Sequence, residues 1–173
     1  RDVSMQKDLN LKIKYRESFR PFAPIVLEEH AKEWFEIEVP SRYMLLTSKV
    51  KKTKLINQNK TLITEGFEKL KIKRSEIPAV THVDNSARVQ TVDVETNSRL
   101  YKLLSKFYEI TSCPVLINTS FNVRGEPIVC KPEDAVKCFL SNELDFLVCE
   151  DFLIYKLENF KTDTDLSQRF EKD

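Results

Sequence analysis

The stretch Val115-Leu-Ile-Asn-Thr-Ser-Phe-Asn-Val-Arg-Gly-Glu-Pro127 begins as an apolar strand and changes at Asn118 into a polar loop. Loops that follow strands carry binding groups in many α/β folds. The density of hydrogen-bond donors favours a binding loop, although the same Asn and Ser side chains also suit a turn that satisfies its own backbone. The candidate binding residues of this loop are Asn118, Thr119, Ser120, Asn122 and Arg124.

Strand and helix patterns interleave on both sides of this loop. Apolar runs and alternation predict strands over 43–49, 79–83, 87–92, 114–118, 127–130, 146–149 and 152–155, the last two completing one sheet. Helical spacing predicts helices over 4–14 with Ser4 as cap, 26–36, 65–70, 96–111 capped by Thr96 or Asn97, and 132–141. The class is therefore mixed α and β, and the strand order is left open.

The length of 173 residues suits one domain with a tail. We expect a domain over 1–155, with a lysine-rich excursion at 50–76 and a peripheral tail at 156–173. The excursion is expected to be a solvated surface.

The charge balance argues against a general nucleic-acid binder, because the sequence contains 28 basic and 27 acidic residues, whereas such a protein is usually strongly basic. Apolar runs are too short for a membrane span, and the N-terminus does not resemble a signal peptide. The four cysteines fit no paired zinc spacing, which leaves the cytoplasm as the expected location and no metal site in this chain.

Glycine is scarce, with Gly66 and Gly125 as the two examples. A P-loop or a dinucleotide fingerprint needs several glycines close together, so both are excluded. Any phosphate must be held mainly by side chains.

A second cluster of candidates is the cationic segment Lys14-Tyr-Arg-Glu-Ser-Phe-Arg20, which runs into Pro21 and Pro24. Arg offers a fork of donors that matches phosphate, and Lys offers a compact charge. Lys14, Arg16 and Arg20 are therefore candidates for an anion site. The alternative is that they cap a helix and pair with Glu17.

A third candidate pair is Arg88 and Gln90, which face the same side of a predicted strand. A charge in such a strand needs a partner or a function, and an ion pair with an aspartate is equally open. His30 and His82 give weak support for acid–base catalysis.

Four motifs together resemble the C-terminal domain of carbamoyltransferases, the family of the nodulation-factor, cephamycin and tobramycin carbamoylating enzymes. They are Phe19-Arg-Pro-Phe-Ala-Pro24, Ile77-Pro-Ala-Val-Thr-His-Val-Asp84, Ala87-Arg-Val-Gln-Thr-Val92 and Asn118-Thr-Ser-Phe-Asn-Val-Arg-Gly-Glu-Pro-Ile-Val129. The resemblance covers about Arg1 to Tyr155. Lys14-Tyr-Arg16 and Ser120-Phe-Asn122 also fill a Lys-x-Arg and Ser-x-Asn signature of the wider YrdC/Sua5 group. The 50–76 stretch is longer than this resemblance leads us to expect.

The resemblance implies a YrdC-like twisted mixed sheet flanked by helices, and a two-step reaction. This domain would join carbamoyl phosphate and ATP, with Mg²⁺ expected on the ATP, into carbamoyl adenylate. A preceding Kae1-like domain, which holds the metal site of the family, would pass the carbamoyl group to an acceptor hydroxyl. Since the chain begins at Arg1, we expect it to be a fragment without that domain. A homodimer is left open.

The resemblance also implies roles for the candidates. Lys14, Arg88 and Ser120 would hold the carbamoyl phosphate or its carbamoyl group. Phosphate or nucleotide contacts would come from Arg16, Arg20, Gln90, Asn118, Thr119, Asn122 and Arg124. Two alternatives are a free-standing YrdC-like threonylcarbamoyl-adenylate synthase of tRNA modification and a non-catalytic nucleotide-binding module.

Overall fold

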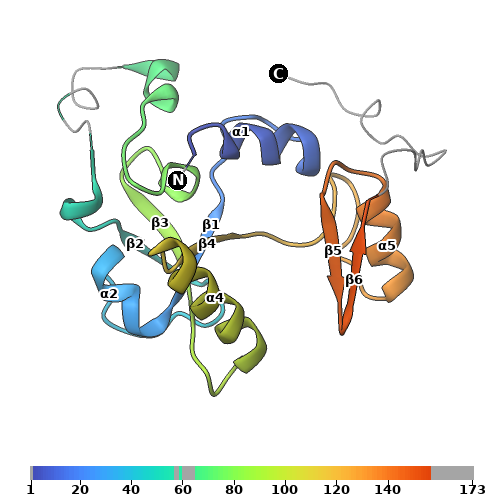
Figure 1. Ribbon diagram of the computed structural model, residues 1–173. Helices are drawn as coiled ribbons and strands as arrows, with labels where there is room; N and C mark the ends of the chain where they lie inside the picture. The colour runs from blue at the N-terminus through green and yellow to red at the C-terminus, as the bar shows by residue number, and fades with distance from the viewer. Residues whose placement is uncertain (1, 57–58, 60–64, 157–173) are drawn as a thin grey trace. The chain divides into compact units, whose positions relative to one another are not determined.

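The computed structural model describes residues 2–56, 59 and 65–156. The chain forms two compact units (Figure 1). Unit 1 consists of Arg1–Val3 and Pro21–Thr119, and unit 2 of Ser4–Arg20 and Ser120–Asp173. Each unit therefore contains segments that are distant in the sequence.

Unit 1 is built on a four-stranded sheet in the order β2-β3-β1-β4 (Figure 1). Its strands are β1 (Ala23–Leu27), β2 (Leu46–Lys49), β3 (Ser86–Val92) and β4 (Val115–Asn118). Strands β1 and β3 are parallel, whereas β2 pairs with β3 and β4 pairs with β1 in the antiparallel sense. The expected mixed α and β class is confirmed.

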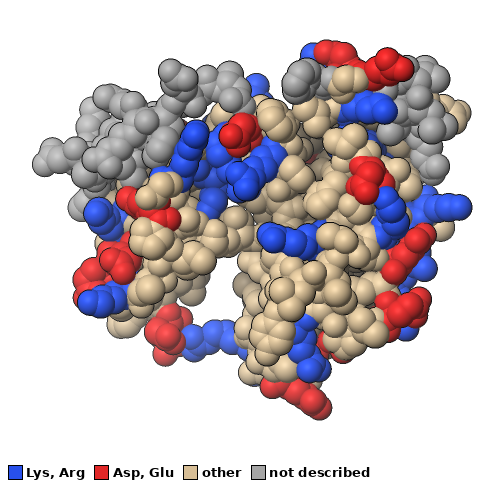
Figure 2. All heavy atoms as spheres, turned by 180° about the vertical axis from the view of Figure 1, so that it is seen from behind, with Lys and Arg blue, Asp and Glu red and all other residues tan. Residues whose placement is uncertain are grey.

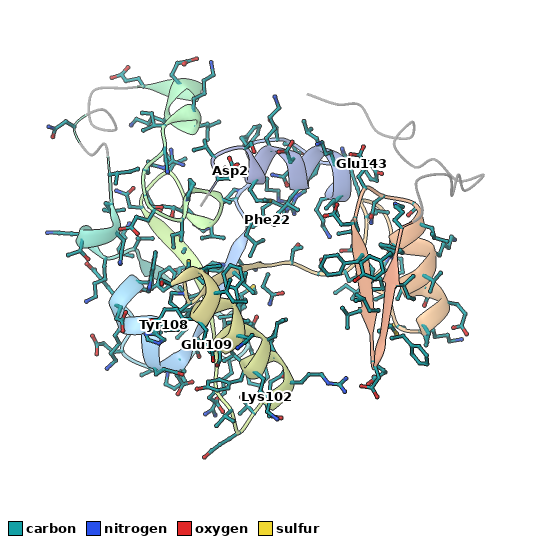
Figure 3. The ribbon with its side chains drawn as sticks, in the orientation of Figure 1. Asp2, Phe22, Lys102, Tyr108, Glu109 and Glu143 are labelled. Carbon is teal, nitrogen blue, oxygen red and sulfur yellow. The ribbon has the colours of Figure 1, made fainter. Side chains whose placement is uncertain are left out.

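Helix α4 (Ser98–Thr111) covers one end of a sheet face in unit 1. It begins after Asn97, whose side chain accepts a hydrogen bond from the Leu100 amide, which confirms Asn97 as the cap. Its fully buried Leu104 packs on Ile25 and Leu27 of β1. Figure 3 shows Lys102, Tyr108 and Glu109 on this helix, and Lys102 and Glu109 are exposed to solvent.

Short helical turns connect the strands of unit 1. They are the 3-10 turns η2 (Glu28–His30), η3 (Lys52–Lys54), η4 (Gly66–Lys71) and η5 (Pro78–Val80), and the short helix α2 (Ala31–Trp34). Trp34 and Phe35 are almost fully buried, so the end of α2 belongs to the core.

In its described residues, unit 2 combines three helical segments with a hairpin. The segments are α1 (Met5–Leu9), the π-helix η1 (Asn10–Lys14) and α5 (Pro132–Leu140). Strands β5 (Phe146–Cys149) and β6 (Phe152–Tyr155) form an antiparallel pair. Leu147 and Ile154 on one face of this hairpin pack on Ala135 and Phe139 of α5.

Several predicted elements have a different structure. The helix predicted over 26–36 is wrong at its start, because Val26 and Leu27 belong to β1 and the helical turns cover only 28–34. All five residues of β1 are buried, and a short apolar run without alternation suits either a strand or a helix. Pro24 also argued against a strand, because proline has no amide hydrogen to donate to a neighbouring strand. In the structure, β1 pairs with β3 only from Ile25 onward, so the missing amide of Pro24 costs no hydrogen bond to β3.

The strands predicted over 79–83 and 127–130 are not formed. Pro78–Val80 is a 3-10 turn, and the Asp84-Asn85-Ser86 turn leads into β3 alone. Among the residues that the structure describes, segment 127–130 makes one backbone–backbone hydrogen bond, from the Val129 amide to the Phe121 carbonyl. Strands β5 and β6 form a sheet of their own and do not complete the sheet of unit 1.

The excursion at 50–76 lies partly outside the described residues. Its predicted helix near 65–70 is the 3-10 turn η4. The tail at 157–173 lies wholly outside them.

Charged side chains of both signs are interspersed on the molecular face seen in Figure 2, in line with the net charge of +1. Within the described residues, every helix lacks the length and apolar character needed to cross a membrane.

Candidate anion-binding site

Lys14 reaches its position because the first helix of unit 2 widens. The α-helical turn of α1 gives way at Asn10 to a π-helix, in which the Tyr15 amide donates to the Asn10 carbonyl five residues earlier. Such widened turns are rare and are frequently found at functional sites. Tyr15 ends the helix in a left-handed conformation with a φ of 49°, so the chain reverses directly after Lys14.

The ammonium group of Lys14 is buried among neutral oxygens. Nζ donates to the Ser120 carbonyl at 2.8 Å, the Asn122 carbonyl at 2.6 Å and the Asn122 Oδ1 at 2.7 Å, and the Ser120 hydroxyl lies at 3.4 Å. Only 5% of Lys14 is exposed. Among the described residues, its ammonium forms no ion pair with a carboxylate. Its positive charge is therefore solvated by the protein but not neutralised.

This environment weakens the basicity of Lys14. Burial, and then the nearby positive charge of Arg16, lower the pKa of Lys14 from 10.5 to about 8. The side chain is mostly charged at pH 7. An anion close to it would stabilise the charged form.

The loop after β4 is held in shape by its own side chains. The Ser120 hydroxyl donates to the Asn122 Oδ1 at 2.6 Å, and the Asn122 Nδ2 donates to the Glu126 carbonyl at 2.9 Å. Gly125 has a φ of 78°, a left-handed conformation that lets the loop turn at little steric cost. Lys14 binds this loop at Ser120 and Asn122, so the two motifs form one structural feature.

Asn10 holds the segment that carries Arg16 and Arg20. This asparagine is fully buried, and its Oδ1 accepts a 2.6 Å hydrogen bond from the Arg16 Nε. Its Nδ2 donates to the carbonyls of Ser18 at 3.1 Å and Arg20 at 2.8 Å. One side-chain amide therefore orients a guanidinium and fixes the backbone of the following turn.

Tyr15 anchors the same segment from the other side. Its hydroxyl donates to the Ser141 carbonyl at 2.9 Å, at the end of α5. Its ring packs on Val123 and Cys138 in a small buried cluster. The positions of Lys14 and Arg16 thus depend on a packed tyrosine between them.

A cavity of about 280 Å³ lies beside these groups. Its lining includes four cations and one carboxylate, Glu17, which lies 4.0 Å from the Arg20 guanidinium. Burial, and then the charge of Arg20, lower the pKa of Arg16. Like charges held together in this way favour an anion between them. The lining residues are Lys14, Arg16, Glu17, Arg20, Ser120, Asn122, Val123, Arg124 and Gly125.

A family model described as Carbamoyltransferase C-terminus matches residues 1–156. The chain belongs to this family. The resemblance drawn from the four motifs is confirmed.

Curated relatives of this carbamoyltransferase C-terminus include the uncharacterized protein sll1178 of Synechocystis sp., with 56% identity over 159 residues, which are 90% of the chain and 26% of that protein. The nodulation protein NolO of Bradyrhizobium diazoefficiens is 38% identical over 86% of the chain and 24% of its own length. The nodulation protein U of Azorhizobium caulinodans is 40% identical over 72% of the chain and 19% of its own length. The chain thus spans about a quarter or less of the length of these relatives.

Six of the ten predicted site residues of this carbamoyltransferase C-terminus line the cavity in unit 2. They are Lys14, Arg16, Arg20, Ser120, Asn122 and Arg124. The alternative interpretation of Arg20 as a partner of Glu17 also holds, at the long distance given above.

The other four predicted residues, Arg88, Gln90, Asn118 and Thr119, belong to unit 1. The Asn118 Nδ2 donates to the Gln90 Oε1 at 2.5 Å, across β1, so both lie on the same sheet face. By alternation Arg88 shares that face. Its side chain is exposed, and no ion pair with an aspartate is found among the described residues. Thr119 is exposed at the end of β4.

His82 is not in a strand, contrary to its prediction. Its Nδ1 lies 3.1 Å from the Ser86 hydroxyl, which donates to Asp84 at 2.6 Å. Burial lowers the pKa of His82, and the negative charge of Asp84 opposes this effect. The three residues shape the turn before β3.

Sequence reasoning missed Asn10 and Tyr15. A signal for Asn10 was present, because asparagine is a poor residue for a helix interior and stands in the middle of the predicted 4–14 helix. The burial of Tyr15 left no such signal in a segment of charged residues.

The described residues do not include a group of three or more His, Cys, Asp or Glu side chains that could hold a metal ion. Glu17 is the one carboxylate among the residues that line the cavity. Mg²⁺ prefers several oxygen ligands, and a single carboxylate does not supply them.

Proposed function

We propose that this domain binds carbamoyl phosphate and ATP and joins them into carbamoyl adenylate. The observation that carries the proposal is the cavity of unit 2, which is lined by Lys14, three arginines, polar residues of the loop after β4 and a single carboxylate. Family membership supports the same chemistry. The domain would act as part of a longer carbamoyltransferase.

The proposed reaction suits a cationic site. Water first cleaves the phosphate from carbamoyl phosphate, which gives carbamate and inorganic phosphate. A carbamate oxygen then forms a bond to the α-phosphorus of ATP while the bond from that phosphorus to the leaving pyrophosphate breaks. Negative charge grows on the phosphorus oxygens in this step. Cations that are already held in place stabilise that charge without having to reorganise. Asn10 and Tyr15 provide this fixation for Arg16 and Lys14.

Lys14 and Ser120 have linked parts in this proposal. The Lys14 ammonium is held by the backbone and side chains of Ser120 and Asn122, so the positive charge of Lys14 and the hydroxyl of Ser120 keep a fixed position relative to each other. Ser120 is exposed, and its hydroxyl can exchange its hydrogen bond to Asn122 for one to a carbamoyl or phosphate oxygen. Asn122 and Arg124 would contribute further donors from the same loop.

The size of the cavity favours a small anion. Its 280 Å³ lie at the lower limit of pockets for drug-sized ligands, which span roughly 300–1,000 Å³. We propose that it holds carbamoyl phosphate or the phosphates of ATP, and not the adenosine. Arg88, Gln90, Asn118 and Thr119 are proposed to contribute to substrate binding as well.

Transfer of the carbamoyl group to an acceptor hydroxyl is assigned to another domain of the longer protein. A cytoplasmic location is part of the proposal, because ATP and carbamoyl phosphate are cytoplasmic metabolites.

The test is to incubate the chain with carbamoyl phosphate, ATP and Mg²⁺ and to follow the products by mass spectrometry. We expect carbamoyl adenylate or AMP, together with pyrophosphate and inorganic phosphate. Threonine and bicarbonate in place of carbamoyl phosphate should give no adenylate. Formation of threonylcarbamoyl adenylate from them, with no product from carbamoyl phosphate, would establish the tRNA-modification alternative instead. ATP binding without any product from either mixture would indicate a non-catalytic module.

A matched pair of variants ties the activity to the cavity. Arg16→Gln removes a lining cation, whereas Lys12→Gln removes an exposed cation that pairs with Asp8 at 3.5 Å and does not line the cavity. Arg16→Gln should lower carbamoyl phosphate affinity by roughly tenfold or more, which corresponds to at least about 1.4 kcal/mol. Equal effects of the two changes would remove the cavity from the mechanism.

A further inference from the structure

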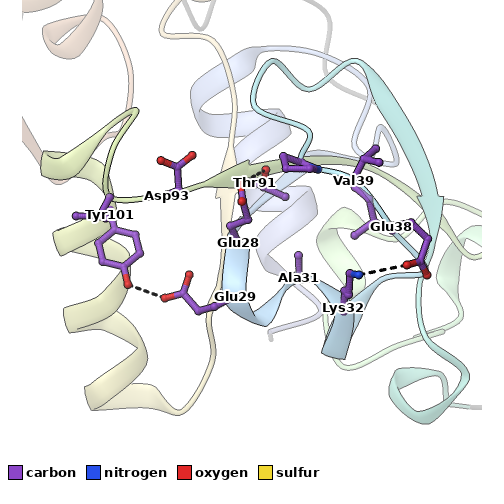
Figure 4. A pocket seen from close by; sticks show the side chains of 12 residues that line it. Glu28, Glu29, Ala31, Lys32, Glu38, Val39, Thr91, Asp93 and Tyr101 are labelled. Carbon is purple, nitrogen blue, oxygen red and sulfur yellow. Dashed lines mark hydrogen bonds and ion pairs between the residues drawn. The ribbon is translucent and has the colours of Figure 1, made fainter.

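A second and larger cavity, of about 520 Å³, lies wholly within unit 1 (Figure 4). It is formed where β1 and β3 end, beside α2, segment 37–40 and the first turn of α4. The residues that line it are Glu28, Glu29, Ala31, Lys32, Ile37, Glu38, Val39, Pro40, Thr91, Asp93, Val94 and Tyr101. Its volume falls in the usual range for small-molecule sites.

The lining of this second cavity has an apolar part and a polar part. Ile37, Val39, Pro40 and Val94 supply apolar surface. The polar part contains four carboxylates and one cation, Lys32, so its formal charge is −3. An anionic ligand is therefore disfavoured here.

Three of the four carboxylates already have hydrogen-bond or ion-pair partners. Glu29 accepts a 2.6 Å hydrogen bond from the Tyr101 hydroxyl, and Figure 4 shows this contact at one side of the cavity. Glu38 accepts from the Lys32 ammonium at 3.2 Å. Asp93 lies against the Arg42 guanidinium at 2.9 Å and also accepts from backbone amides of the next turn.

Glu28 differs from these three. Its Oε2 accepts one long hydrogen bond of 3.3 Å from the Thr91 hydroxyl, and among the described residues no cation pairs with it. Thr91 is only 3% exposed and is fixed by the Ser41 amide, which donates to its hydroxyl at 2.9 Å. Glu28 is thus a positioned carboxylate with unused acceptor capacity inside a cavity.

A metal ion does not suit this arrangement. Glu29, Glu38 and Asp93 are committed to separate partners. Together with Glu28, they do not form a group that could hold a metal among the described residues. The negative charge that remains available is that of Glu28, which lies beside the apolar lining of the cavity. An organic cation with one charged end would match both this charge and the apolar surface.

We propose that this cavity binds a small organic amine. Its ammonium group pairs with Glu28, and its hydrocarbon part lies on Ile37, Val39 and Val94. The Tyr101 hydroxyl, which donates to Glu29, can accept a hydrogen bond from a polar group on a larger amine. This proposal does not depend on the carbamoyl adenylate proposal, because the two cavities have no lining residue in common.

The test uses three probes of similar size and shape, namely n-butylamine, 1-butanol and butyrate. Titration into the ¹⁵N-labelled chain is followed by NMR. Butylamine should shift the amide signals of the residues that line the cavity, with a Kd of about 1 mM, as suits so small a ligand. Butanol and butyrate should bind at least tenfold more weakly. Equal binding of butanol and butylamine would overturn the proposal, because the charge of Glu28 would then have no role.

A matched pair of variants checks the residue. Glu28→Gln keeps the shape of the side chain and removes its charge, and it should weaken butylamine binding about tenfold. Glu36→Gln removes an exposed carboxylate that does not line the cavity, and it should leave the affinity unchanged. Wild-type affinity in Glu28→Gln would refute the site. The probe comparison on the unmodified chain holds even if Glu28→Gln perturbs folding.

Discussion

Replacing Asn10 by alanine tests whether this buried residue positions the arginines of the anion site in addition to stabilising unit 2. Asn10→Ala removes an acceptor of the Arg16 Nε and a donor to the Ser18 and Arg20 carbonyls. The residue itself is fully buried and does not line the cavity. Any loss of anion affinity would therefore be transmitted through Arg16 and Arg20.

The expected magnitude follows from these three contacts. A hydrogen bond to a charged group contributes about 1.5–3 kcal/mol and a neutral one about 0.5–1.5 kcal/mol. The sum is about 2.5–6 kcal/mol, and Arg16 and Arg20 can recover part of it from water because neither is fully buried. We expect a loss of unfolding free energy of about 3 kcal/mol. Ordering a released arginine costs about 0.5–1.5 kcal/mol, so anion affinity should fall about two- to tenfold.

The assays are denaturant unfolding followed by circular dichroism and calorimetric titration with sulfate. Asn142→Ala is the matched control. Asn142 is a buried asparagine of the same unit, accepts a 3.0 Å hydrogen bond from the Leu144 amide and does not line the cavity. This control should lower stability and leave sulfate affinity unchanged.

A double-mutant cycle completes the experiment. Because Asn10 is argued to act through Arg16, the effects of Asn10→Ala and Arg16→Ala on sulfate affinity should not add. Wild-type affinity in a folded Asn10→Ala variant, or full additivity of the two changes, would refute the positioning role.

Further predictions concern both units. Arg88→Ala should weaken carbamoyl phosphate binding by more than tenfold while the fold survives, and unchanged binding in a titration would remove Arg88 from the proposed site. Sulfate keeps its charge between pH 6 and 9, so its affinity should fall by roughly tenfold as pH rises through the pKa of Lys14 at about 8, whereas a Lys14→Met variant should show no such step. The same residue should make unfolding free energy rise between about pH 8 and 10.5, because the unfolded chain binds the proton more tightly there. Asn97→Ala should cost about 1 kcal/mol of stability through the lost cap on the Leu100 amide, measured by thermal unfolding against an exposed control such as Lys102→Ala.

Hydrophobic periodicity correctly predicted the elements that have one buried face and one face exposed to solvent. Helix α4 alternates between a face on the sheet and a face in solvent, so its spacing and its cap were readable. Strand β1 is buried on both faces and contains Pro24, and its apolar run therefore matched the helical template equally well. The separate β5–β6 hairpin was predicted as strands, but the sheet to which a strand belongs depends on distant contacts that no local pattern records.

The anion site shows a similar division. Its cations and loop were predictable because phosphate chemistry demands particular side chains, and these stand out in a sequence with two glycines. The residues that position these cations and this loop were not predictable. The buried amide of Asn10, the left-handed Tyr15 and the neutral oxygens that hold the Lys14 ammonium arise from packing, which the composition of a segment does not reveal.

The π-helix at Asn10–Lys14 places a limit on how this region can vary in length. Deleting one residue between Asn10 and Lys14 would remove the extra residue of this widened turn, and the ammonium group would rotate about the helix axis by a large angle, away from Ser120. Substitutions in the three intervening residues leave this angle intact. Homologous sequences should therefore be aligned through this turn without gaps, and designed variants should change its side chains while keeping its residue count.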